Sequence, residues 1–208
     1  MPDRINAILM ASGFSTRFGG RNKLLIPFRG KPLARHTLDL VLGMEFAGVF
    51  FVAAGDETAA LASEGPERLR VIRNRHPERG QRESIRLGVA AAAGAGARDA
   101  EGEDWYLFFP CDQPFLDRGT VGLIVEARRP GCIVQPCAGG RPGNPCLFSG
   151  AFRDELLTLR RGEHGRDLIG RHPERLIRVE VAASPLTDID DPETLALFNV
   201  PVHERRRL

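Results

Sequence analysis

The residues best suited to phosphate binding lie close together near the start of the chain. A short apolar run ends at Ser12 and Gly13, and Arg17 and Lys23 follow soon afterwards with a glycine pair between them. Glycines let backbone N–H groups come close to a ligand, and the two cationic side chains would add fixed positive charge. Residues 8–25 are therefore predicted to form a strand that leads into a phosphate-binding loop, although a glycine-rich turn that binds nothing has a similar composition.

This loop does not match two common nucleotide-binding motifs. It lacks the GxGxxG spacing of dinucleotide folds, and Lys23 is followed by Leu24 instead of the Ser or Thr of a P-loop. Both of these nucleotide sites are therefore disfavoured.

Carboxylates follow a second apolar run and recur near the end of the chain. Asp112 stands directly after the run WYLFFPC, and Asp188, Asp190 and Asp191 precede Pro192. A carboxylate at the carboxyl end of a buried strand can hold a divalent cation against phosphate oxygens, so Asp112 is a candidate metal ligand. A turn or a helix cap is the alternative for Asp112. The later cluster is predicted to cap a helix, to supply a second metal carboxylate facing Asp112, or to do both.

Three further segments combine glycines with polar side chains. Gly80 and Ser84 lead into a predicted helix whose start could face a nucleotide, unless Ser84 only caps that helix. The segment GRPGNPCLF could present Asn144 to a substrate or form a plain hairpin turn. The segment GEHGRDLI could place Gly165 and Arg166 beside a ligand.

The elements that must position these residues alternate along the chain. Apolar, strand-like runs are predicted at 7–10, 49–53, 70–72, 105–109, 133–137 and 177–181. Helices are predicted at 32–42, 57–64, 84–93, 118–127 and 152–159, with another after Asp191. Strands and helices in turn, with nearly continuous apolar strands, indicate a three-layer α/β domain built on a mostly parallel sheet. In such sheets ligands bind beyond the carboxyl ends of the strands, which is where the loop after residue 11 would lie.

Composition narrows the kind of protein. The 208 residues suit one domain, predicted over residues 1–200, with a basic tail at 201–208. The 29 basic and 27 acidic residues give a net charge of +2, so neither a nucleic-acid nor a membrane-binding surface is indicated. The four cysteines form no C-x-x-C pair and are predicted to be reduced, buried thiols. Because no apolar run suits a signal peptide or a membrane span, a soluble cytoplasmic protein is predicted.

Taken in order, these segments resemble the MobA-like nucleotidyltransferases, and most closely their molybdenum cofactor cytidylyltransferase (MocA-type) branch. The matching segments are LMASGFSTRFGGRNKLL, RGKPL, GQRESIRLG, CDQPFL, GRPGNPCLF, GEHGRDLI and DIDDPETL. They follow the family's order and extend from residue 8 to about residue 195. The resemblance implies a Rossmann-like nucleotidyltransferase domain that works with Mg²⁺.

The resemblance also implies a role for each candidate residue. Arg17 and Lys23 would hold the triphosphate and neutralise the pyrophosphate leaving group, and Asp112 would be the principal Mg²⁺ ligand, with Asp190 as the second. The catalytic set is Arg17, Lys23 and Asp112; the nucleotide-binding set is Ala11, Ser12, Gly13, Ser15, Arg17, Lys23, Gly80 and Ser84; and the acceptor side is Asn144, Gly165 and Arg166. Positioning and charge neutralisation carry such transfers, so no covalent nucleophile on the protein is needed.

The implied reaction transfers CMP from CTP to the terminal phosphate of molybdopterin and releases pyrophosphate. Gln113 before Pro114 and the SIRLG, GNP and GEHGRD segments are similar to the cytidylyl branch. The spacing from Gly19 to Lys23 is more similar to the guanylyl branch, and Ser12 matches neither. CTP is therefore expected and GTP is the alternative. A sugar or polyol phosphate could instead be the acceptor, or the chain could be a non-catalytic chaperone for the cofactor. A recipient molybdoenzyme is a further candidate partner.

Overall fold

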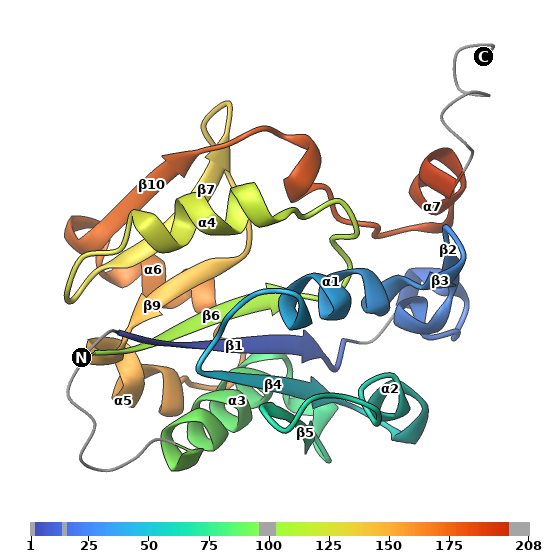
Figure 1. The fold of residues 1–208 in the computed structure, drawn as a ribbon, viewed down its shortest axis with the longest axis horizontal. Coiled ribbons are helices and arrows are strands. Elements are labelled where there is room, and N and C mark those ends of the chain that lie inside the picture. The colour runs from blue at the N-terminus through green and yellow to red at the C-terminus, as the bar shows by residue number, and fades with distance from the viewer. Residues whose placement is uncertain (1–2, 14–15, 96–102, 200–208) are drawn as a thin grey trace.

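Figure 1 shows the computed structural model of the chain, which describes residues 3–13, 16–95 and 103–199. Ser15, a predicted nucleotide-binding residue, and the predicted tail at 201–208 lie outside the described residues. None of the helices in the described part combines the length and the apolar composition that crossing a bilayer requires.

One large sheet runs through the middle of the molecule. Its strands lie in the order β10, β7, β9, β6, β1, β4 and β5, and the short β8 pairs with β7. Neighbours along this path are parallel except where β9 pairs with β6 and β7. The strands are β1 (Arg4–Ala11), β4 (Gly48–Ala53), β5 (Leu69–Arg73), β6 (Asp104–Pro110), β7 (Ile133–Ala138), β8 (Arg141–Pro142), β9 (Cys146–Ser149) and β10 (Leu176–Glu180). The predicted mostly parallel sheet is confirmed.

Helices cover both faces of this sheet (Figure 1). One face carries α1 (Leu33–Leu42), α2 (Asp56–Ala60) and α4 (Arg118–Glu126), and the other carries α3 (Gln81–Ala95), α5 (Arg153–Leu157) and α6 (Gly165–Arg171). A small hairpin of β2 (Pro27–Phe28) and β3 (Lys31–Pro32) lies near the last helix, α7 (Pro192–Asn199), at one end of the sheet. The predicted three-layer α/β architecture is therefore confirmed.

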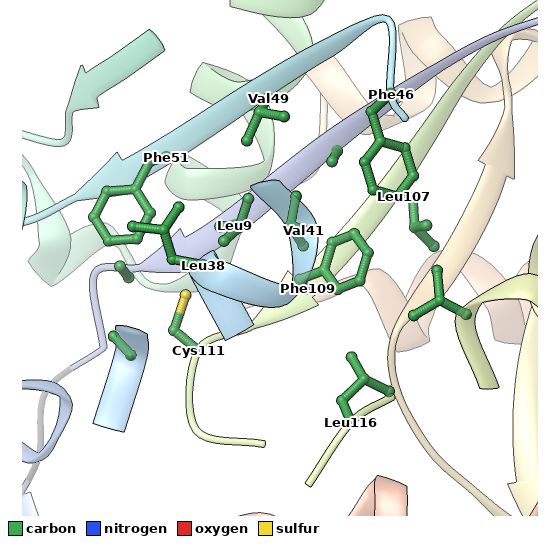
Figure 2. Packing of buried hydrophobic residues seen from close by; sticks show 14 of the residues in the cluster. Leu9, Leu38, Val41, Phe46, Val49, Phe51, Leu107, Phe109, Cys111 and Leu116 are labelled. Atoms are coloured by element: carbon green, nitrogen blue, oxygen red, sulfur yellow. The ribbon is translucent and has the colours of Figure 1, made fainter. Parts of the chain in front are cut away.

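The strands send alternate side chains into the two layers. Leu107 and Phe109 of β6 pack on the side of α1 and α4, whereas Tyr106 and Phe108 pack on the side of α3. Figure 2 shows the first of these layers, in which Leu38 of α1 lies over the strands. Because both faces are covered, the central strands β1, β4 and β6 are apolar at nearly every position, which explains why they appear in the sequence as continuous apolar runs.

The sequence pattern misses or misplaces several elements. β9 is not predicted, because four strand residues inside a glycine- and proline-rich segment give no clear periodicity. The predicted helix at 57–64 ends already at Ala60. The predicted helix at 84–93 begins earlier, at Gln81, so the alternative that Ser84 caps this helix is wrong.

Gly88 lets α3 lie close to β1. A Cβ atom at Gly88 would come within 2.4 Å of Ile8 Cγ2, and Ile8 is fully buried and β-branched. Since neither the helix nor Ile8 can move away without disturbing the core, Gly88→Ala is expected to destabilise the fold by about 1–3 kcal/mol.

Gly94→Ala in the same helix is the matched control. Apart from its chain neighbours and its own helix backbone, no described atom lies within 4 Å of a Cβ at Gly94, so this variant should be stabilised by up to about 1 kcal/mol through helix propensity. Urea unfolding of both variants tests the prediction, and a Gly88→Ala protein as stable as the Gly94→Ala protein would contradict it.

Candidate active site

The carboxyl ends of β1 and β6 meet at one edge of the sheet. In the parallel register Met10 of β1 lies opposite Pro110 of β6. Ser12 follows the first strand and Asp112 follows the second. The sheet thus brings the predicted phosphate loop and the predicted metal carboxylate together although they are far apart in the sequence.

Lys23 lies between two carboxylates from distant parts of the chain. Its Nζ is 2.7 Å from Asp112 Oδ2 and 2.8 Å from Asp190 Oδ1. It also donates to the carbonyl oxygen of Ile189 over 3.2 Å. The Lys23 and Asp112 side chains are largely buried, whereas Asp190 is half exposed. Both predicted metal ligands therefore converge on one residue predicted to hold the triphosphate.

A short 3₁₀ turn, η2 (Lys23–Leu25), fixes the position of Lys23. Asn22 caps this turn, because its side-chain oxygen accepts a hydrogen bond from the Leu24 N–H over 3.1 Å. The Asn22 amide also donates to Thr58 Oγ1 of α2 over 2.8 Å. With Leu24 buried beneath it, the turn is anchored on both sides.

The C-terminal carboxylates divide their roles. The Ile189 N–H donates to the Asp112 carbonyl over 2.9 Å, which aligns this segment beside the end of β6 and places Asp190 at the site. Asp191 instead caps α7, since its Oδ1 accepts from the Thr194 N–H over 2.7 Å. The predicted helix cap is therefore present at Asp191, whereas Asp190 shares Lys23 with Asp112, and the metal role of Asp190 stays a prediction.

Negative charge exceeds positive charge around Lys23. Burial lowers the pKa of Lys23, but the charge of Asp112 and hydrogen bonds to Asp112 and Asp190 outweigh burial and raise this pKa above its ordinary value. Asp188 is exposed as a residue, but its carboxyl group is surrounded by other parts of the chain. This burial, together with the charge of Asp112, raises the pKa of Asp188 to about 6. Asp112 Oδ1 is buried and has no hydrogen-bond partner among the described residues. The net negative charge of these carboxylates suits a divalent cation.

A cavity of about 380 Å³, the first cavity, lies beside this cluster. It is lined by the predicted nucleotide-binding residues Ser12, Gly13, Lys23, Gly80 and Ser84, together with Asp112 and others. α3 begins at this cavity with Gln81, and the N-terminus of a helix carries partial positive charge that favours phosphate. Its size is within the range of small-molecule sites.

Three of the predicted nucleotide-binding side chains are engaged within the protein. The Ser12 hydroxyl donates to the Val52 carbonyl over 3.0 Å, and Ala11 is buried in the core. The Ser84 hydroxyl accepts from the Asn74 amide over 3.2 Å. At Ala11 and Ser12 the backbone is therefore the part that a ligand could use.

Arg17 is placed differently from the prediction. It lies exposed in a second short turn, η1 (Thr16–Phe18), and is not among the described residues that line the first cavity. Its charge contributes, after hydrogen bonds from Thr194, to lowering the pKa of Asp191. The structure thus brings Lys23 and Asp112 together but leaves Arg17 outside the described lining of this cavity.

A second cavity of about 390 Å³ adjoins the first. All three predicted acceptor-side residues, Asn144, Gly165 and Arg166, line it. Met10 and Gln81 line both cavities, so the two spaces meet at these residues. Two ligands could therefore lie end to end across the carboxyl edge of the sheet.

Each cavity contains a cysteine that is unsuited to nucleophilic chemistry. Burial raises the pKa of Cys146, in the second cavity, to about 12. Burial and the charge of Asp112 also raise the pKa of Cys111, in the first. Because a thiol must ionise to attack, both are poor nucleophiles at neutral pH. All four cysteines are free and buried, as predicted.

The sequence pattern assigned no role to Gln81, at both cavities, or to Asn74, which bonds a residue of the first cavity. Gln81 lines both of them, and its Oε1 accepts from the Gly165 N–H over 3.4 Å. Asn74 is buried and bonds both Ser84 and the His76 N–H. The position of Asn74 in the sequence could have indicated a role at the site. It directly follows β5 of the parallel sheet and so lies at the same carboxyl edge.

Arg29 joins α7 to the β2–β3 hairpin. Its backbone N–H donates to Asn199 Oδ1 over 2.9 Å and its Nε to the Phe198 carbonyl over 3.3 Å. The guanidinium lies 5.0 Å from the ring centre of Phe115. Arg29 has φ 46° and the following glycine φ 87°, as in a two-residue hairpin turn that favours Asn-Gly.

Removing this side chain should loosen α7. Arg29→Asn keeps the turn but loses the contacts with Phe198 and Phe115, so hydrogen exchange of the α7 amides is expected to accelerate about 5- to 30-fold. Arg70→Asn, in a strand at the far edge of the sheet, is the control. Unchanged exchange in α7 of Arg29→Asn would show that the helix is held by other contacts.

Comparison with known proteins agrees with this geometry. Residues 7–176 match the family described as MobA-like NTP transferase domain. Among curated relatives, the nicotine blue oxidoreductase of Paenarthrobacter nicotinovorans is 24% identical over 200 residues, which cover 92% of this chain and 94% of the relative. The molybdenum cofactor guanylyltransferase of Pseudomonas aeruginosa PAO1 is 26% identical over 221 residues, covering 94% of this chain and 97% of the relative.

Solved structures share the whole fold. Rv0371c from Mycobacterium tuberculosis H37Rv superposes with a TM-score of 0.76 at 22% identity, covering 95% of this chain and 99% of that one. A nucleotidyl transferase from Methanothermobacter thermautotroptrophicus superposes with a TM-score of 0.77 at 21% identity, and the match covers 99% of each chain. The family match extends over most of the chain, including the loop, Lys23 and Asp112. This chain belongs to the MobA-like NTP transferase family.

Proposed function

We propose that the protein transfers a nucleotidyl group, CMP from CTP in the first instance, to the terminal phosphate of a molybdopterin-type cofactor and releases pyrophosphate. The observation that carries the proposal is the position of Lys23, which joins Asp112 to Asp190 at the wall of the first cavity. The reaction would take place in the cytoplasm, and a molybdoenzyme would receive the product.

The two adjoining cavities supply the positioning that this reaction needs. The triphosphate would lie in the first cavity, against the backbone after β1, the N-terminus of α3 and the Lys23 ammonium. The acceptor would lie in the second cavity, near Asn144 and Arg166. Its phosphate oxygen would form a bond to the α-phosphorus while the bond from that phosphorus to the bridging oxygen breaks and pyrophosphate leaves. Charge neutralisation by Lys23 would favour this departure.

Asp112 and Asp190 are the residues that would hold Mg²⁺. Carboxylate oxygens are the ligands that this ion prefers, and Asp112 Oδ1 is buried with no partner among the described residues. No group of three or more His, Cys, Asp or Glu side chains in the described ranges has metal-binding spacing. Mg²⁺ commonly binds through one or two carboxylates plus substrate phosphates, so two carboxylates fit it. When bound, Mg²⁺ would supply charge stabilisation at the phosphates.

The choice of base rests on two observations that point in different directions. The segments around Gln113, Asn144 and Gly165 resemble the cytidylyl branch, which supports CTP. Against this, the curated relative from Pseudomonas aeruginosa is named a guanylyltransferase, which supports GTP as the second candidate.

A pyrophosphate-release assay with molybdopterin and Mg²⁺ tests the proposal. CTP, GTP, UTP and ATP are compared at equal concentration, and CTP is expected to give the highest kcat/KM. A preference for GTP would replace CTP by the second candidate. Pyrophosphate release with a sugar or polyol phosphate but not with molybdopterin would reject molybdopterin as the acceptor.

The same assay separates an enzyme from a carrier of the cofactor. A chaperone would retain nucleotide-bound cofactor through purification and release no pyrophosphate with any of the four nucleotides. That result would reject nucleotidyl transfer for this chain.

A further inference from the structure

The Lys23 ammonium is surrounded by the oxygens that a metal ion would use. Asp112 Oδ2, Asp190 Oδ1 and the Ile189 carbonyl lie 2.7, 2.8 and 3.2 Å from Nζ. Two carboxylates and one carbonyl form a donor set that hard cations accept. The oxygens that hold the ammonium would therefore also suit the proposed metal.

An ammonium and a divalent ion cannot share this space. Two cations held between the same carboxylates would repel each other, and the largely buried Lys23 and Asp112 side chains are poorly screened by solvent. The ammonium must move when the metal binds.

The first cavity offers the ammonium a second position. Lys23 lines this cavity together with Ser12 and Gly13, where the triphosphate would lie. A lysine carries its charge on a flexible four-carbon stem, so Nζ can turn from the carboxylates to a phosphate. Nucleotide binding would thus free the carboxylates for the metal.

We propose that Lys23 acts as a placeholder cation, which occupies the Asp112–Asp190 pair until a triphosphate draws it away, so that metal binding is coupled to nucleotide binding. This inference takes its two ligands, the metal and the nucleotide, from the proposed function. It does not depend on the nucleotidyl transfer step. In the absence of nucleotide, Lys23 therefore weakens metal binding. In its presence, the same side chain assists catalysis.

Calorimetric titration with Mn²⁺ in the absence of nucleotide tests the proposal. Lys23→Met removes the ammonium but keeps an unbranched side chain, and it is expected to bind Mn²⁺ at least about tenfold more tightly than the wild type. Arg21→Met is the matched control: it removes one positive charge from an exposed residue of the same segment and should change the Mn²⁺ affinity less than about threefold.

Two further variants keep the result decisive. Lys23→Gln repeats the measurement with a polar side chain, in case Lys23→Met does not fold. Adding Asp190→Asn to Lys23→Met should remove most of the gain, which ties the gain to this carboxylate pair. Equal or weaker Mn²⁺ binding by both folded Lys23 variants, or an equal gain in Arg21→Met, overturns the proposal.

The outcome is separable from the proposed function. Tighter Mn²⁺ binding by Lys23→Met would uphold the placeholder role even if no nucleotide were turned over. Turnover by the wild type without any gain in Lys23→Met would uphold the transfer reaction and reject the placeholder role.

Discussion

Asp112→Asn is expected to lower kcat for pyrophosphate release at least about 1,000-fold while the protein stays folded. The amide has the size of the carboxylate but no charge, so it would neither hold a divalent ion strongly nor pair with Lys23. The fold should tolerate the change, because Lys23 keeps its contacts with Asp190 and the Ile189 carbonyl. A stability change of about 1–2 kcal/mol or less is expected in urea unfolding.

Two variants of the C-terminal carboxylates calibrate this prediction. Asp191→Asn should retain activity, because Asn caps a helix as well as Asp and this residue caps α7. Asp190→Asn should fall between the two, with a loss of about 10- to 100-fold, because Asp190 is half exposed and less tightly held than Asp112. If Asp112→Asn turned over as fast as Asp191→Asn, the carboxylate after β6 would have no part in the reaction.

Lys23→Ala is expected to lower kcat/KM for the nucleotide by about 100- to 1,000-fold. The Lys23 ammonium contacts both carboxylates, and the side chain lines the first cavity. Its removal would leave the negative charge of the triphosphate and of the departing pyrophosphate less neutralised. Circular dichroism and urea unfolding would confirm that the variant folds. A loss below tenfold in a folded variant would assign the phosphate contacts to other residues.

The pH dependence of this lysine has a defined sign. The pKa of Lys23 is raised above its ordinary value of 10.5 by Asp112 and Asp190 despite burial. Its ion pairs therefore stabilise the fold fully below pH 10.5 and are lost as the pH rises through the raised value. The stability difference between wild type and Lys23→Ala should be constant from pH 7 to about 9, measured by urea unfolding. A difference that shrinks within this range would show that the lysine titrates earlier.

Much of the fold follows from the apolar pattern along the chain. A parallel sheet covered on both faces needs strands that are apolar at nearly every position, so the runs of β1, β4 and β6 were recognisable without tertiary information. Local chemistry also indicated a helix cap within the aspartate cluster before Pro192, and Asp191 provides it. β9 escaped prediction because its place between β6 and β7 depends on pairing with distant strands.

The candidate site could be predicted only in part from the sequence. The types and order of Ser12, Lys23 and Asp112 predicted a phosphate and metal site, and the carboxyl edge of the sheet brings these residues together. The direction in which each side chain points could not be predicted from the sequence. Ser12 donates to a strand carbonyl and Arg17 is exposed and does not line the first cavity, because these orientations are set by neighbours that a linear pattern does not contain.

The sequence by itself determined the three-layer α/β class, the loop after β1 and the carboxylate after β6, since these depend on local composition and on the order of strands and helices. Only the tertiary structure decided that Asp190 rather than Asp191 meets Lys23, and that the two cavities adjoin at Met10 and Gln81. The physical reason is that the contacts of Lys23 with Asp112 and Asp190 join residues far apart in the chain. Such contacts arise from the packing of whole elements, which no short stretch of sequence encodes.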